Sequence, residues 1–115
     1  MTDIVKKIEE EVKSNKIIVF MKGSKDAPQC GFSSAVVDVF SALNVPFETR
    51  DVLADNELRD GIKRYSNWPT IPQVYINGRF VGGCDITREL YKTGELQKLI
   101  HLLSGRKLKG HLVVI

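Results

Sequence analysis

Cysteine is scarce in this sequence of 115 residues, which contains only Cys30 and Cys84. Long apolar runs are also missing, because no stretch approaches the roughly 20 apolar residues that a membrane-spanning helix needs. Charge of one sign is scarce as well: the formal net charge is +3, and no basic run is interleaved with aromatic residues. These absences argue against a membrane protein and against a nucleic-acid-binding protein.

What is present fits one soluble domain in a reducing compartment. Hydrophobic residues make up 43% and charged residues 27% of the chain, as in globular proteins, and a chain of this length can bury a core without disulfides. Residues 1–15 alternate in charge, unlike a signal peptide, and form no arginine-rich leader. Two cysteines without secretory features indicate a reducing environment. We therefore expect a cytoplasmic protein, with the mitochondrial matrix or another organelle as the alternative if a leader was removed.

Four amphipathic stretches have the three- and four-residue spacing of helices with one buried face. Their apolar residues are Ile4, Val5, Ile8 and Val12; Val36, Val37, Phe40 and Leu43; Leu58, Ile62 and Tyr65; and Ile86, Leu90 and Tyr91, continued by Leu96, Leu99, Ile100 and Leu103. Capping residues mark the ends of these helices. The expected caps and stops are Thr2 or Asp3, Asp55 or Asn56, Gly94 and Gly105.

The strands are predicted from short apolar or β-branched runs. Residues 17–21 form such a run, and residues 45–52 form a second, which should pair in parallel with the first because a helix separates them. Asn77 and Gly78 between residues 72–76 and 79–81 indicate a tight antiparallel hairpin. The sequence therefore predicts an α/β fold, with a four-stranded mixed β-sheet and helices on both faces.

Cys30 lies at the junction between the first strand, a turn-rich segment over residues 22–29, and a helix. Unpaired backbone N–H groups and the dipole of a helix N-terminus favour a thiolate, which is both a nucleophile and a metal ligand. The alternative is a buried structural cysteine, against which the flanking residues Gln29, Gly31 and Ser33 argue. Ser33 occupies the position at which a dithiol oxidoreductase has its second cysteine, and a hydroxyl cannot resolve a mixed disulfide.

Four motifs carry a family resemblance: the residues CGFS at 30–33, the residues MKG at 21–23 with an insertion reaching Pro28, residues 67–74, and residues 81–85. In order and spacing they resemble the monothiol glutaredoxins. The similarity extends from the N-terminal helix to about Leu103, which implies one domain with the thioredoxin fold over residues 1–105. The tail, residues 106–115, lies outside the resemblance and is frayed, an added strand or a docking segment.

The resemblance implies that the chain binds glutathione and assembles [2Fe–2S] clusters for transfer to iron–sulfur acceptor proteins. Lys22 resembles the family's contact to the glycyl carboxylate. Arg59 and Lys63 can reach the same end of the ligand, or else belong to a solvated helix face. The peptide bond between Ile71 and Pro72 matches the place where related folds have a cis proline. The γ-glutamyl end is expected at Cys84 and Asp85, although Asp85 is also a candidate helix N-cap.

The number of ligands leaves two ways to hold the cluster. A [2Fe–2S] cluster generally takes four thiolates. A homodimer can supply Cys30 from each subunit and complete the set with two glutathione molecules, or it can supply Cys30 and Cys84 from each subunit. We favour glutathione, because Cys84 lies in the ligand-binding stretch of the family. The resemblance also names BolA-like proteins as partners.

A second function is a glutathione-dependent oxidoreductase. The Cys30 thiolate can attack a glutathionylated protein, and free glutathione can then resolve the mixed disulfide; Cys84 is a conceivable distant partner of Cys30. The family's activity of this kind is generally weak. Other conspicuous residues have structural interpretations: His101 and His111 lack a second ligand at metal spacing, and Trp68 packs the loop. Phe32 belongs to the core, shields the thiol or contacts a partner subunit.

Overall fold

A mixed β-sheet of four strands lies at the centre of the structure, with the strand order β4-β1-β5-β6. The computed structural model describes residues 3–101. The strands are β1 (Ile17–Met21), β4 (Glu48–Asp51), β5 (Gln73–Ile76) and β6 (Arg79–Gly82). β1 pairs in parallel with β4 and antiparallel with β5. The mixed sheet predicted from the sequence is confirmed.

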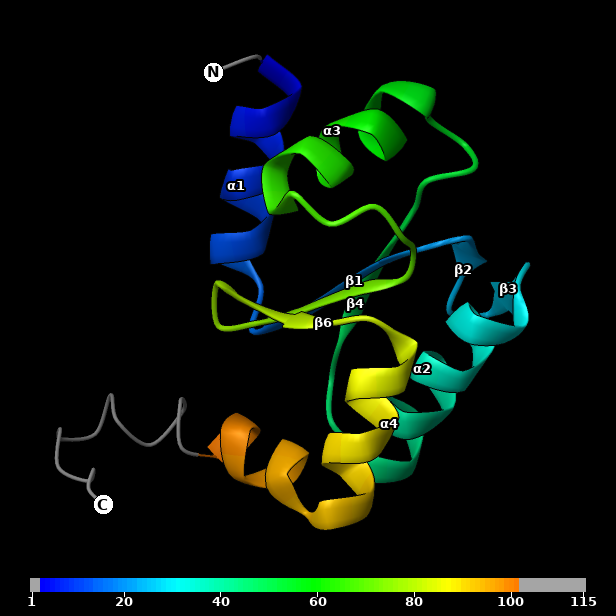
Figure 1. Cartoon of the computed structure of the whole chain (residues 1–115), viewed down its shortest axis with the longest axis vertical. Helices are drawn as coiled ribbons and strands as arrows, with labels where there is room; N and C mark the ends of the chain where they lie inside the picture. Colours follow the sequence, from blue (N-terminus) through cyan, green and yellow to red (C-terminus); the bar gives the residue numbers. More distant parts are fainter. Residues whose placement is uncertain (1–2, 102–115) are drawn as a thin grey trace, which may run out of the picture.

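Helices cover both faces of the sheet, as predicted (Figure 1). They are α1 (Asp3–Ser14), α2 (Gly31–Leu43), α3 (Asn56–Ser66) and α4 (Cys84–Thr93), followed by further helical residues at 95–101. α1 packs against α3, and α2 packs against α4. Figure 1 shows the first pair on one side of the sheet and the second pair on the other. Within residues 3–101, no helix is both long and apolar enough to cross a membrane.

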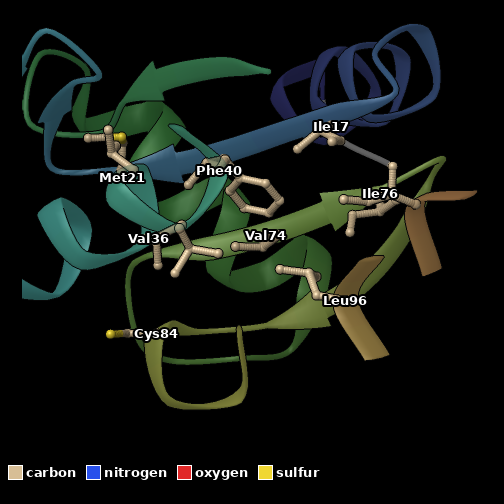
Figure 2. Close-up of a cluster of buried hydrophobic side chains, with 12 residues drawn as sticks. Ile17, Met21, Val36, Phe40, Val74, Ile76, Cys84 and Leu96 are labelled. Atoms are coloured by element: carbon tan, nitrogen blue, oxygen red, sulfur yellow. The ribbon is translucent and has the colours of Figure 1, made fainter. Parts of the chain in front are cut away.

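Each face of the sheet has its own hydrophobic core, because successive side chains of a strand point to opposite faces and all five residues of β1 are buried. Ile18 and Phe20 pack in the core beneath α1 and α3. Ile17, Val19 and Met21 pack in the core beneath α2 and α4, which Figure 2 shows. A single apolar run in the sequence therefore holds both layers of helices.

The hairpin between β5 and β6 has the predicted turn. Asn77 and Gly78 have φ angles of 50° and 84°, the left-handed conformations that two-residue hairpin turns require. The β5–β6 ladder also contains an irregularity between Val74 and Tyr75.

Two strand predictions differ from the structure. The second strand begins at Glu48 and not at residue 45, because Pro46 has no N–H for a sheet and the ring of Phe47 packs against Phe40, with centroids 5.6 Å apart. The segment 22–29, predicted as turns alone, forms a small hairpin of β2 (Gly23–Ser24) and β3 (Ala27–Pro28). Two-residue strands are too short to leave a periodic signal in the sequence.

Three predictions about helices also need correction. Gly83 is the N-cap of α4, so Asp85 lies within the first turn and does not cap the helix. Asp3 is likewise in the first turn of α1 rather than at its cap, whereas Asp55 caps α3 by accepting from the N–H of Leu58 at 3.1 Å. Ile86, assigned to the buried face of α4, is 41% exposed. The predictions for Thr2, Leu103, Gly105, His111 and the tail 106–115 lie outside the described residues.

Candidate functional site

Cys30 is the N-cap residue of α2, as the junction of strand and helix predicted. Its backbone is extended, with φ −156° and ψ 140°, and its side chain is half-buried. Hydrogen bonds from the backbone N–H groups of Ser33 and Phe32 lower the pKa of the Cys30 thiol below its ordinary value, and the positive charge of Lys22 adds to this effect. These donors are free because the first turn of a helix has no intrahelical acceptors for them.

Ser33 differs from the expectation that it lies on an exposed flank of the thiol. It is fully buried, and its Oγ accepts a hydrogen bond from the backbone N–H of Lys22 at 3.1 Å. The same hydroxyl interacts with the Cys30 sulfur and contributes to lowering the pKa of Cys30. Ser33 therefore ties the end of β1 to the start of α2 and fixes the position of the thiol.

A groove of two adjoining cavities begins at this thiol. The first, of about 460 Å³, brings together Lys22, Cys30, Arg59 and Lys63, and its size is typical of small-molecule pockets. Among residues 3–101, none of the three cations in it forms an ion pair. Arg59 and Lys63 line this cavity, while Arg59 is also exposed to solvent, as the alternative of a solvated helix face implies.

The second cavity, of about 230 Å³, extends the groove to the start of α4. It is lined by Cys84 and Asp85 from α4 and by Trp68 from the loop before β5. Phe32 and Ile71 line both cavities. All seven residues predicted for the site therefore lie along one continuous groove.

Two groups of residues lie on different parts of the groove lining, beside the residues from α3 and α4 that also line it, and we name them for what they contribute. The thiol wall consists of Lys22, Cys30 and Phe32, from the end of β1 and the start of α2. The loop wall consists of Trp68, Thr70, Ile71 and Pro72, from the segment between α3 and β5.

The loop wall presents backbone to the groove at Ile71. The peptide bond between Ile71 and Pro72 is cis, as the resemblance implied. Within residues 3–101, the N–H of Ile71 donates no hydrogen bond. Because backbone N–H groups in proteins are almost always paired, this donor is available to an extended peptide lying in the groove.

Cys84 is buried, with 7% of its surface exposed. Figure 2 shows it at the margin of the core, its sulfur turned away from Val36 and Val74. Both cysteines are free thiols in the structure. Of the two, only Cys30 combines exposure with hydrogen bonds that favour the thiolate.

The groove has an apolar rim, of which the sequence interpretation named Phe32 as one alternative and missed Leu53 and Ile86. Phe32 is 63% exposed and is not a core residue, and Leu53 and Ile86 are exposed beside it. Hydrophobic periodicity assigns apolar residues to the core. It therefore cannot identify apolar residues that are exposed at a binding site. The missed signal is that Ile86 follows directly on the predicted ligand residues Cys84 and Asp85.

Gln73 was the second omission. It stands in an apolar strand and is fully buried, although an amide in a core needs polar partners. Trp68, expected to pack the loop, does so against Phe80, with ring centroids 5.5 Å apart. His101 is exposed. Within residues 3–101, no group of three or more His, Cys, Asp or Glu side chains is placed to hold a metal ion.

Comparison of the sequence with known proteins identifies similar proteins over most of the chain. The glutaredoxin family model matches residues 17–81. The chain is 62% identical over 96 residues to an uncharacterized monothiol glutaredoxin of Synechocystis, covering 84% of this chain and 90% of that protein. It is 58% identical over 93 residues to a chloroplastic monothiol glutaredoxin of rice, covering 81% of this chain but 55% of the relative.

Two solved structures are also similar. The solution structure of reduced poplar apo GrxS14 has a TM-score of 0.74 and 53% identity, covering 84% of this chain and 88% of that one. A crystal structure of a buckwheat glutaredoxin–glutathione complex has a TM-score of 0.75 and 26% identity, covering 84% and 86%.

Proposed function

Because the chain belongs to the monothiol glutaredoxin family, we propose that it binds glutathione in the groove and carries a [2Fe–2S] cluster between two subunits, for transfer to acceptor proteins. The observation that carries this proposal is the state of Cys30. A half-exposed thiol whose pKa is lowered lies between a cationic cavity and a helix N-terminus. The thiolate of each subunit can then serve as one ligand of a cluster that two subunits share.

The groove has the charges that an extended tripeptide with two carboxylates needs. Lys22, Arg59 and Lys63 converge on the first cavity and suit the glycyl carboxylate. At the other end, the first turn of α4 offers backbone N–H groups, and Asp85 offers a carboxylate for the γ-glutamyl ammonium. The glutathione complex of the buckwheat glutaredoxin supports the binding of glutathione. Between the two ends, the free N–H of Ile71 suits the peptide backbone of the ligand.

The thiolate ligands available in this site suit a [2Fe–2S] cluster that is carried and then transferred to another protein. A [2Fe–2S] cluster takes four ligands, and each chain has only two cysteines. Cys84 is buried and lines the far cavity of the groove, so we assign it to glutathione binding and assign Cys30 alone to the metal. Two Cys30 thiolates and the thiolates of two bound glutathione molecules then complete the coordination. Two of these four ligands are not covalently attached to the protein, which favours release of the cluster to an acceptor.

Native mass spectrometry after anaerobic reconstitution with iron, sulfide and glutathione tests the proposal. We expect a species with two chains, two glutathione molecules and one cluster. Cys84→Ser is the matched variant: it should retain this species, while Cys30→Ser should lose it. Loss of the cluster in Cys84→Ser would instead support coordination by four cysteines of the protein.

A second candidate function is removal of glutathione from proteins, and the lowered pKa of Cys30 favours it. The Cys30 thiolate attacks the glutathione sulfur of a protein–glutathione disulfide, the protein leaves as a thiolate that takes up a proton, and a Cys30–glutathione disulfide forms. A second glutathione thiolate then attacks this disulfide, releases oxidised glutathione and restores the Cys30 thiolate. If a metal-free monomer turns over a small mixed disulfide, this activity would rank above cluster transfer as the function of the protein.

The remaining parts of the proposal concern the extent of the domain, its partners and its location. We assign residues 1–105 to the glutaredoxin domain and residues 106–115 to a separate tail. BolA-like proteins and iron–sulfur acceptor proteins are the proposed partners, and the cytoplasm is the proposed location. Co-purification with and without residues 106–115 would show whether the tail takes part in these contacts.

A further inference from the structure

Below the loop wall lies a buried polar pair, Gln73 and Tyr75, on strand β5. Gln73 is 0% exposed and Tyr75 is 2% exposed. β5 is an inner strand of the sheet, with β1 on one side and β6 on the other. A buried amide in such a place has to find its hydrogen-bond partners within the protein, since an unpaired one destabilises the fold.

The side chain of Gln73 is bonded to the backbone of the loop wall. Its Nε2 donates to the carbonyl oxygens of Trp68, at 3.0 Å, and of Thr70, at 3.3 Å. Its Oε1 accepts from the hydroxyl of Tyr75 at 3.0 Å. Because carbonyl oxygens can only accept, one orientation of the amide satisfies all three contacts.

The Tyr75 hydroxyl is a dependable donor in this network. Burial raises the pKa of Tyr75 far above neutral pH, so the hydroxyl stays protonated. Its ring packs against Phe80, with centroids 5.3 Å apart, and Phe80 packs in turn against Trp68. The end of α3 adds one more bond to the loop, since Ser66 Oγ accepts from the N–H of Trp68 at 3.1 Å.

The loop has few backbone hydrogen bonds of its own to replace these contacts. Pro69 and Pro72 have no N–H, and the N–H of Ile71 is unpaired within the described part of the chain. Thr70 and Ile71 nevertheless line both cavities of the groove. Their positions therefore depend on side chains that never reach the ligand.

We propose that Gln73, oriented by Tyr75, is a positioning residue that holds Thr70 and Ile71 in place for the ligand and thereby sets the affinity of the groove for glutathione. This inference rests on the proposed binding of glutathione. A loop that is already held in its binding position does not lose conformational entropy when the ligand binds. Avoiding this entropic cost increases the affinity. Cys30 is positioned by other elements, so its chemistry should not depend on Gln73.

The test is an NMR titration with S-methylglutathione, which cannot form a disulfide with Cys30. Gln73→Glu keeps the shape of the side chain but replaces the two amide N–H donors to the loop with a carboxyl group, which has no donor when ionised and one when protonated, so we expect affinity to fall about tenfold. Hydrogen exchange at the Trp68 N–H, which donates to Ser66 Oγ and to the Lys63 carbonyl oxygen, should be faster in the same variant without ligand. The pH dependence of Cys30 alkylation should stay as in the wild type, a separation that general loss of structure would not produce.

Tyr75→Phe keeps the ring, removes only the donor to Gln73, and carries the test if Gln73→Glu does not fold. We expect an affinity loss of about threefold, in the same direction. Tyr65→Phe is the matched control, because the Tyr65 ring packs against Tyr75, with centroids 5.9 Å apart, but its hydroxyl makes no hydrogen bond to Gln73 among the described residues. Its affinity should equal that of the wild type.

Three results would overturn the inference. Wild-type affinity in folded Gln73→Glu would remove the positioning role while leaving the proposed function intact. An equal loss in Tyr65→Phe and Tyr75→Phe would assign the effect to aromatic packing. Failure of the wild type itself to bind S-methylglutathione would contradict the proposed function, and with it the role of Gln73 in affinity.

Discussion

The thiol wall and the loop wall line the same groove but are held in place by different means. The thiol wall is fixed mainly by backbone geometry: Cys30 caps α2, and Lys22 precedes the tight hairpin of β2 and β3. The loop wall is fixed by buried side chains, chiefly Gln73, that bond to its carbonyl oxygens.

This difference separates reactivity from affinity. The groups that lower the pKa of Cys30 belong to α2 and the end of β1, and none belongs to the loop wall. Substitutions beneath the loop should therefore alter ligand binding and leave the Cys30 thiol unchanged, whereas substitutions in the thiol wall can alter the thiol, the local backbone and, at Lys22, ligand binding as well. Each prediction below tests one side of that separation.

The largest effect is expected for Gly23→Ala. Gly23 has a φ of +89°, and a Cβ placed there would lie 2.5 Å from the carbonyl oxygen of Ala27 and 2.7 Å from the backbone nitrogen of Gln29. The contacts are with backbone atoms, which cannot move aside without opening the hairpin. We expect a loss of stability of about 2 kcal/mol or more, measured by urea denaturation.

Gly31→Ala is the matched control for this prediction. Gly31 begins α2, and a Cβ there would meet nothing within 4 Å. Alanine is the better helix former, so stability should be unchanged or should rise by about 0.5–1 kcal/mol. Similar losses in both variants would show that the thiol wall does not depend on the hairpin geometry.

Lys22→Ala should have the next largest effect, on glutathione affinity. Lys22 contributes one of the three cations in the first cavity, so its removal should weaken S-methylglutathione binding about tenfold in low salt, with a smaller loss as salt increases. The control is Lys92→Ala, because Lys92 lies in the last turn of α4 and lines a separate cavity outside the groove. If Lys92→Ala weakens binding as much, net charge and not the groove decides affinity.

The sequence alone predicted the scaffold better than it predicted the groove. Strong local signals located β1, the Asn77-Gly78 turn and the cap position of Cys30, because periodicity and turn chemistry act between neighbours in the chain. The groove joins residues distant in sequence, and spacing alone left Arg59 and Lys63 as a solvated helix face. The family resemblance supplied the assignment that spacing could not.

The failures have a shared physical origin. Ser33 is a polar residue whose partner, the Lys22 N–H, lies 11 positions away, so its burial leaves no local pattern. Gln73 alternates with apolar residues as a solvent-facing residue would, but β5 is an inner strand of the sheet with helices on both faces. Ile86 is apolar and exposed because it borders a binding site. In each case, tertiary contacts overrode the local pattern.

Ser33→Ala should have a smaller effect, confined to the thiol wall. The variant loses the acceptor for the Lys22 N–H, at 3.1 Å, which should cost about 1 kcal/mol of stability. It also removes a contact that lowers the pKa of Cys30, so the midpoint of Cys30 alkylation against pH should rise. Ser34→Ala, one residue further along α2, is the control and should leave that midpoint in place.

The smallest effect is expected for the midpoint of Cys30 alkylation against pH. The measurement uses iodoacetamide and a Cys84→Ser background, so that Cys30 is the only cysteine, and it compares the two walls directly. In the wild-type fold, backbone N–H groups of Ser33 and Phe32 lower the pKa of Cys30, so the midpoint should lie below that of the same chain unfolded in urea. By linkage, stability should rise as pH increases from the folded to the unfolded pKa, and this gain should be lost as pH falls through the folded value.

Gln73→Glu in the same background should leave the alkylation midpoint unchanged, although it weakens ligand binding. Its side chain contacts Trp68, Thr70 and Tyr75, and none of these influences the Cys30 thiol. A shift in the midpoint would show that the buried network beneath the loop also acts on the thiolate. The two walls would then be one coupled unit, and affinity and reactivity could not be varied independently.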